Sequence, residues 1–146
     1  SFAIGLRMEH PQEMISKAMY GGEYYKLPAA PYKVTHQASN GRAVYSFCMC
    51  PGGYVVNASS EEGRLVVNGM SNYARDEVNA NSAIIVNVTP EDFGSDDVLA
   101  GVHFQEKLEE VLSNKNSANL SLLTNSSTSF NSTLIVILKS ILITSL

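Results

Sequence analysis

Residues 32–39 read YKVTHQAS and residues 42–50 read RAVYSFCMC, two runs rich in strand-forming residues that are joined by Asn40-Gly41. Asn-Gly between two such runs favours a two-residue type I′ turn, because both residues can adopt a positive φ angle. With that turn, Lys33 faces Cys48 across the two strands. The stretch therefore predicts an antiparallel β-hairpin and a fold built on a sheet.

Side chains alternate across a strand, so the predicted hairpin has two faces. The more polar face carries Lys33, Thr35, Gln37, Val44, Ser46, Cys48 and, by extension, Cys50. The other face, which we expect to pack on the core, carries Tyr32, Val34, His36, Tyr45, Phe47 and Met49. Both cysteines are therefore expected on the polar face.

Further strands and helices are predicted on both sides of the hairpin. Strands are expected in four more runs: 2–8, 54–59, 64–71 and 82–88. Residues 100–112 space their apolar side chains as one helical face, and Thr89-Pro90-Glu91-Asp92 is typical of a helix cap. The predicted fold class is α+β, a mostly antiparallel sheet with an Asn-Gly hairpin and two or three flanking helices.

The segment after His10 predicts the first helix. Pro11 is expected at its first position, where the missing N–H of proline costs no hydrogen bond. Gly21 and Gly22 are expected to end it. Apolar side chains fall on one face of this helix: Met14, Ile15, Ala18 and Met19.

The composition divides the chain into two parts. A hydrophobic content of 45% and a net charge of −4 suit a globular domain and give no reason to expect a nucleic-acid partner. All acidic residues, glycines and prolines lie at or before Glu110, whereas residues 113–146 are rich in Ser, Asn, Thr, Leu and Ile. We therefore expect a domain over residues 1–112, and a poorly ordered tail over residues 113–146 outside the fold.

Neither end of the chain carries a recognisable targeting signal. The apolar stretch 132–146 is shorter than the ~20 residues that span a bilayer and includes Lys139, which argues against a membrane partner. The first ten residues lack a basic segment followed by an apolar one, so no secretion signal is predicted and a cytoplasmic location is expected. Because the chain opens on Ser1, we expect a fragment of a longer protein.

The two cysteines leave two interpretations open. No metal site is predicted, because two sulfurs need further ligands and the three histidines are scattered. A disulfide is disfavoured, because residues i and i+2 of a strand lie roughly 6.5 Å apart with parallel side chains. Cys48 and Cys50 are then either packing residues or, with Lys33 stabilising the Cys48 thiolate, part of a reactive site on a ligand-lining face.

The turn Pro51-Gly52-Gly53 also has two interpretations. Its glycines fit an ordinary tight turn, and they equally permit close approach of the backbone to a ligand. The sequence contains no G-x-G-x-x-G, P-loop, G-x-S-x-G or H-E-x-x-H motif. The residues alone therefore predict no cofactor cradle.

Polar groups elsewhere are open to the same pair of interpretations. Arg7, Glu9 and His10 are either groups of a site or a solvated strand end. The amide-rich stretch 72–82 either contacts a ligand or forms ordinary surface.

Four stretches resemble the C-terminal part of a family of bacterial FAD-dependent dehydrogenases: GLRMEHPQEMI, RAVYSFCMCPGGYVV, NGMSNYARDEVNANSAIIVNVTPEDFG and AGVHFQEKLEE. The resemblance covers residues 2–110. It implies a flavoprotein oxidoreductase that transfers a hydride to or from FAD for an unidentified small-molecule substrate. The chain would be the substrate-side, or cap, region, and its partner would be an FAD-binding domain of the same parent polypeptide.

The resemblance also implies where a site would lie. The residues expected nearest to flavin or substrate are Cys48, Met49, Cys50, Pro51, Gly52 and Gly53, with Lys33 beside them. A second group consists of Asn79, Asn81 and Ser82. Because the Gly-rich FAD loop is missing from this sequence, the chain alone is expected to be inactive and to bind FAD poorly.

An alternative of a different class is a stand-alone thiol-based binding or redox module. It would use Cys48 and Cys50 without any flavin.

Overall fold

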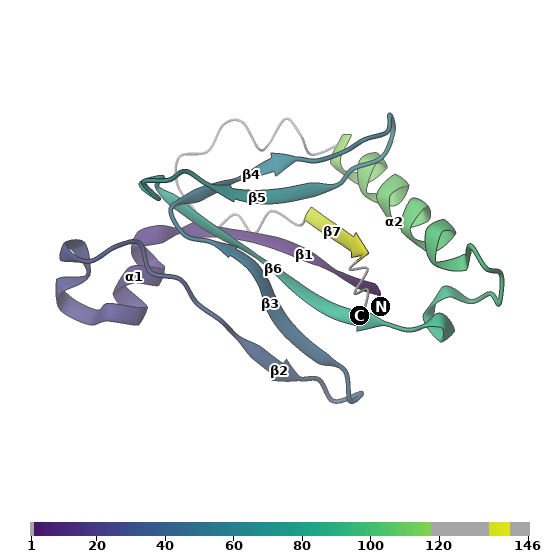
Figure 1. Ribbon diagram of the computed structural model, residues 1–146, viewed down its shortest axis with the longest axis horizontal. Coiled ribbons are helices and arrows are strands. Elements are labelled where there is room, and N and C mark those ends of the chain that lie inside the picture. Colours follow the sequence, from purple (N-terminus) through teal and green to yellow (C-terminus); the bar gives the residue numbers. More distant parts are fainter. Residues whose placement is uncertain (1, 118–134, 141–146) are drawn as a thin grey trace, which may run out of the picture.

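The computed structural model describes residues 2–117 and 135–140, and within them confirms the predicted α+β class. A five-stranded sheet has the order β2-β3-β6-β1-β7, and a two-stranded sheet pairs β4 with β5; every pairing is antiparallel (Figure 1). The strands of the larger sheet are β1 (Phe2–Pro11), β2 (Thr35–Gln37), β3 (Ala43–Cys50), β6 (Asn79–Val88) and β7 (Ile135–Ser140). The smaller sheet contains β4 (Gly53–Asn57) and β5 (Val67–Ser71).

Helices lie at opposite ends of this sheet (Figure 1). The α-helices are α1 (Gln12–Tyr20) and α2 (Ala100–Ser117). Two 3₁₀ segments accompany them: η1 (Gly21–Lys26) follows α1, and η2 (Pro90–Phe93) precedes α2.

The core lies between the two sheets. Ala3, Ala83, Ile85 and Val67 form a buried cluster, and neighbouring side chains complete it: Tyr45, Phe47, Val55 and Leu65. Small residues on β1 and β6 let the second sheet approach closely. The prediction that Tyr45 and Phe47 face the core is confirmed, but His36 and Val34, predicted on the same face, are exposed.

The hairpin is confirmed, but its predicted register is wrong. Thr35 pairs with Tyr45 and His36 with Val44, one residue away from the expected alignment, so Lys33 does not face Cys48. The loop has three residues, and among them Gly41 alone takes a positive φ, of 81°. A type I turn followed by a left-handed glycine is the usual three-residue hairpin, and it shifts every partner by one position.

A second register change, at Cys48, separates the two cysteines. Phe47 pairs with Ala83 and Cys50 with Asn81, so two residues of β3 stand opposite Ser82 alone, as in a β-bulge. Cys48 has a φ of 51°, which is rare for a residue with a side chain. The prediction that both cysteines share the polar face is therefore wrong: Cys48 is exposed and Cys50 is buried.

The predicted caps of both helical segments are close to those observed. Pro11 precedes α1 instead of starting it, and Gly21 ends the helix with a φ of 75°. Thr89 and Asp92 form the capping box of η2, with a bond of 2.8 Å from the Thr89 N–H to the Asp92 carboxylate. The cap predicted from Thr89-Pro90 is thus confirmed for η2.

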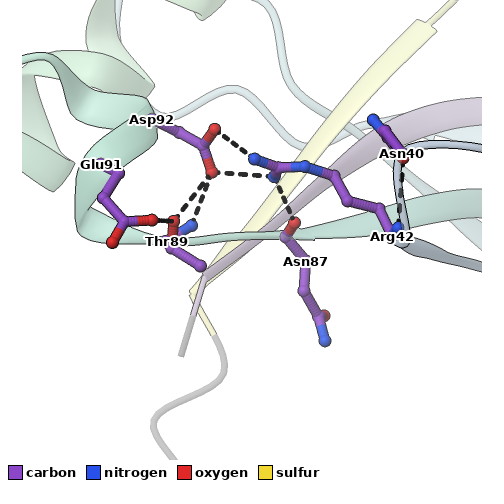
Figure 2. Close-up of polar contacts among 6 residues, drawn as sticks. All are labelled: Asn40, Arg42, Asn87, Thr89, Glu91 and Asp92. Carbon is purple, nitrogen blue, oxygen red and sulfur yellow. Dashed lines mark hydrogen bonds and ion pairs between the residues drawn. The ribbon is translucent and has the colours of Figure 1, made fainter.

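Arg42 joins this cap to the hairpin (Figure 2). Its guanidinium donates to both carboxylate oxygens of Asp92, at 2.8 and 2.5 Å, and to the Asn87 carbonyl at 3.0 Å. Hydrogen bonds from Arg42 and from the Thr89 backbone lower the pKa of Asp92 to about 2. The ion pair therefore fixes the hairpin against η2 at any pH near neutral.

The boundary expected near residue 112 falls inside α2, which continues to Ser117. β7 also comes from the predicted tail, and it pairs with β1 from Phe2↔Ser140 to Arg7↔Ile135. The remaining tail residues, 118–134 and 141–146, lie outside the described part of the chain.

Candidate functional site

The two groups of predicted site residues lie side by side in the sheet. β3 pairs with β6, and Cys50 stands directly opposite Asn81. Arg7, on the other side of β6, reaches both strands. We call Arg7, Cys50, Asn81 and the backbone carbonyl of Cys48 the Arg7 cluster.

Arg7 is the centre of this cluster and is only 1% exposed. Its Nη1 donates to the Cys48 carbonyl at 3.2 Å and to Asn81 Oδ1 at 2.5 Å. Its Nε has no partner among the described residues, where no carboxylate forms an ion pair with it either. The interpretation of this position as a solvated strand end is therefore wrong for Arg7, and the guanidinium holds the carbonyl of the bulge.

Gly69 in β5 makes room for the cluster, which sequence reasoning missed. A Cβ at this position would lie 2.0 Å from Arg7 Nη1 and 2.1 Å from Asn81 Oδ1. Asn81 is fully buried, and its Nδ2 donates to no described acceptor. The backbone of β5 thus covers a cation and a free amide donor, which together form a site for a hydrogen-bond acceptor or an anion.

The turn at Gly52 and Gly53 packs against the chain's own backbone. A Cβ on Gly52 would lie 1.8 Å from the Arg75 carbonyl oxygen, and one on Gly53 would lie 2.2 Å from that of Met70. The Gly52 N–H donates to Gln12 Oε1 at 2.6 Å. Both glycines are thus explained by tight packing within the chain, the ordinary-turn interpretation, and the Gly52 N–H is already engaged.

The neighbouring Pro51 is held in the same way. Its carbonyl accepts a hydrogen bond of 2.8 Å from the Ser71 hydroxyl. Pro51 is buried, and Met49, which precedes the buried Cys50, is half-buried. Among the predicted residues of this turn, Cys48 is the exposed one.

The two thiols have different environments. Cys50 Sγ donates to the Cys48 carbonyl at 3.3 Å, and burial raises the pKa of Cys50, an effect that Arg7 partly opposes. Cys50 is therefore a neutral thiol at neutral pH. Cys48 is open to reagents on a strained backbone, while Lys33 is exposed and one position away from the alignment that would place it opposite.

Ser82 and Tyr32 border the cluster on the other face of β6. The Ser82 hydroxyl donates to the Ala83 carbonyl at 3.1 Å and to the Phe47 carbonyl at 3.3 Å. Burial raises the pKa of Tyr32, and hydrogen bonding to Ser82 opposes that shift. His10, whose ring centre lies 5.4 Å from that of Tyr32, has its pKa lowered by burial and is therefore uncharged at neutral pH. Asn79 is half-buried where β6 begins.

The described residues do not fit a role as the holder of FAD. A dinucleotide phosphate needs free backbone N–H groups beside glycines that leave open space. Here the space beside Gly52 and Gly53 is filled, and the Gly52 N–H is bonded to Gln12. Within residues 2–117 and 135–140 there is also no group of three His, Cys, Asp or Glu side chains able to hold a metal ion.

A separate hollow of about 290 Å³ lies between η2 and the start of α2. Its walls include Phe2, Phe93 and Val102, and Asp96 and Asp97 stand at its edge. None of the predicted site residues lines it.

The fold and this cluster place the chain in a class of flavoprotein domains. The chain belongs to the family described as FAD-dependent protein, C-terminal domain-like, whose profile matches residues 1–136. An "uncharacterized protein" of Clostridium beijerinckii is 56% identical over 114 residues, which are 76% of this chain and 21% of that protein. The chain thus spans about a fifth of the length of this relative. No helix in the described part of the chain is long and apolar enough to cross a membrane.

Proposed function

We propose that this chain is the substrate-side, or cap, region of a bacterial FAD-dependent dehydrogenase that works in the cytoplasm. It packs against the FAD-binding domain of the same parent polypeptide. FAD in the intact protein exchanges a hydride with a small-molecule substrate. The observation that carries the proposal is the family match over residues 1–136, in a chain whose own glycine turn is closed to phosphate.

The chain's own residues would shape the site and not perform the redox step. Arg7 and Asn81 fix the bulge, and the bulge presents Cys48 at the surface. The free donors Arg7 Nε and Asn81 Nδ2 suit an acceptor group of substrate or flavin. Met49, Asn79, Ser82 and Lys33 would line the same region.

Flavin retention tests this proposal. The chain alone and the full-length relative from Clostridium beijerinckii are each saturated with FAD, desalted and measured by visible absorption. We expect the chain alone to be colourless and the full-length protein to keep its flavin. Stoichiometric FAD on the chain alone would contradict the proposal, and so would a full-length protein that never binds flavin.

Thiol chemistry at Cys48 is a second candidate, favoured by its exposure on a strained bulge. A thiolate there would attack a small disulfide, forming a mixed disulfide and releasing the other sulfur as a thiol. Cys50, buried and neutral, is expected to react far more slowly. The test compares the reaction of the chain and its Cys48→Ser variant with a small disulfide; equal rates would remove this candidate.

A further inference from the structure

The segment that contains α1 and η1 exposes an unusual number of large apolar side chains. Five of them lie between residues 14 and 27: Met14, Met19, Tyr20, Tyr25 and Leu27. Met19 is 56% exposed and Tyr25 is 68% exposed. We call these five side chains the α1–η1 surface.

The orientation of α1 is fixed by polar contacts, so these side chains cannot turn inward. Gln12 and Ser16 are the buried residues of the helix. Gln12 Nε2 donates to the Ala30 carbonyl at 3.0 Å, and the Gln12 Oε1 atom accepts from Gly52. Rotating the helix to bury Met14 would leave these buried groups without partners, which costs more than apolar burial returns for one side chain.

The charges around this surface cancel within it. Glu13 pairs with Lys17 at 2.8 Å and Glu23 with Lys26 at 2.8 Å. Residues 12–27 contain no other Asp, Glu, Lys or Arg. A neutral surface rich in Met and Tyr has the composition of a protein–protein interface, whereas an anionic lipid surface would need an excess of basic residues.

From this we infer that the α1–η1 surface is the docking surface for the FAD-binding domain of the parent polypeptide. The inference rests on the proposed function and adds the side of the chain that meets the flavin domain. About four fifths of the relative's length lies outside the match, which supplies a large partner in the same polypeptide. Because Gln12 joins α1 to Gly52, a domain docked here would lie beside the turn at Cys48–Gly53.

Side-chain labelling tests the docking surface. In the full-length relative, the residues that match this chain are replaced by those of this chain, and the product is compared with the chain alone. Hydroxyl-radical labelling and mass spectrometry give rates at Met14, Met19, Tyr20 and Tyr25. Met70 and Tyr73, which are exposed elsewhere, serve as internal controls.

Labelling of the α1–η1 surface should fall about tenfold in the full-length protein, with little change at Met70 and Tyr73. Equal rates in both proteins would overturn the inference, and so would an equally large fall at the two controls. Met19→Glu in the full-length protein should restore labelling of Met14 and Tyr25. The matched variant Val98→Glu, on an exposed side chain near α2, should not.

Two further readouts separate the explanations. Light scattering of the chain alone should give a monomer; a dimer that Met19→Glu dissociates would make a second copy the occupant and overturn the inference. Flavin is measured on the same full-length sample. Bound FAD without protection overturns the docking surface and leaves the proposed function, whereas protection without FAD does the reverse.

Discussion

The Arg7 cluster and the α1–η1 surface reverse the usual distribution of polar and apolar side chains. Between the sheets, a guanidinium that is 1% exposed bonds to Asn81 and to a strained carbonyl. At the end of the sheet, a helix buries Gln12 and Ser16 and leaves methionines and tyrosines exposed. The first region therefore obtains its contacts from this chain, whereas the second has an apolar surface suited to a partner.

Gly52, where the two regions meet, should give the largest effect. Gly52→Ala combines a φ of 49° with a Cβ 1.8 Å from the Arg75 carbonyl, so we expect a loss of about 3 kcal/mol or more in unfolding free energy, measured by urea denaturation. Gly63→Ala is the matched control, because Gly63 has a φ of 76° and nothing near its Cβ position. It should cost only about 1 kcal/mol, and equal losses would show that the packing at Gly52 is unimportant.

Arg7→Met should give the next largest effect. It leaves the Cys48 carbonyl and Asn81 Oδ1 without their donor, which should cost about 2 kcal/mol and speed modification of Cys48 by a thiol reagent. The control is Arg64→Met, whose ion pairs with Glu61 and Glu106 lie nearer the surface and should be worth about 0–1 kcal/mol. A variant as stable as the original chain would mean that the cluster does not join the sheets.

A smaller effect is expected from the Arg42–Asp92 pair, which serves as a reference outside both regions. The pKa of Asp92 is lowered from 3.8 to about 2, so the carboxylate stabilises the fold at higher pH and this contribution is lost as pH falls from about 4 to about 2. Asp92→Asn should therefore differ from the original chain above pH 4 and converge with it near pH 2, as followed by thermal unfolding. An Asp96→Asn control should run parallel to the original chain, and a parallel Asp92→Asn curve would rule out the pair's contribution.

The smallest effect is predicted on the α1–η1 surface. Met19→Glu should change the unfolding free energy of the isolated chain by less than about 0.5 kcal/mol, because the side chain is already in water. Ile85→Ala, in the core, should cost about 2–5 kcal/mol in the same assay. A large loss from Met19→Glu would show that this side chain packs within the chain.

Local chemistry predicted much of the fold. Asn40-Gly41 identified the hairpin and Thr89-Pro90 the cap, because each signal acts over a few neighbouring residues. The register was wrong because Gly41 alone takes the positive φ, and Asn-Gly fits a three-residue loop as well as a two-residue one. Lys33 was placed opposite Cys48 by that single shift.

The candidate site was less predictable, since it depends on contacts between distant segments. Cys50 and Asn81 were both named, yet their pairing required β3 to lie beside β6. The bulge at Cys48 and the clearance at Gly69 arise from Arg7 entering between the sheets, which no local pattern encodes. A glycine in a strand, such as Gly69 in β5, was the one available signal, because such glycines often mark close approach of another group.

Urea denaturation of Arg7→Met and Met19→Glu, measured side by side in the isolated chain, decides whether the two regions differ as described. A clear loss of unfolding free energy for Arg7→Met with almost none for Met19→Glu is the predicted result. The opposite ranking would contradict it, because the exposed helix would then stabilise the chain and the buried guanidinium would not.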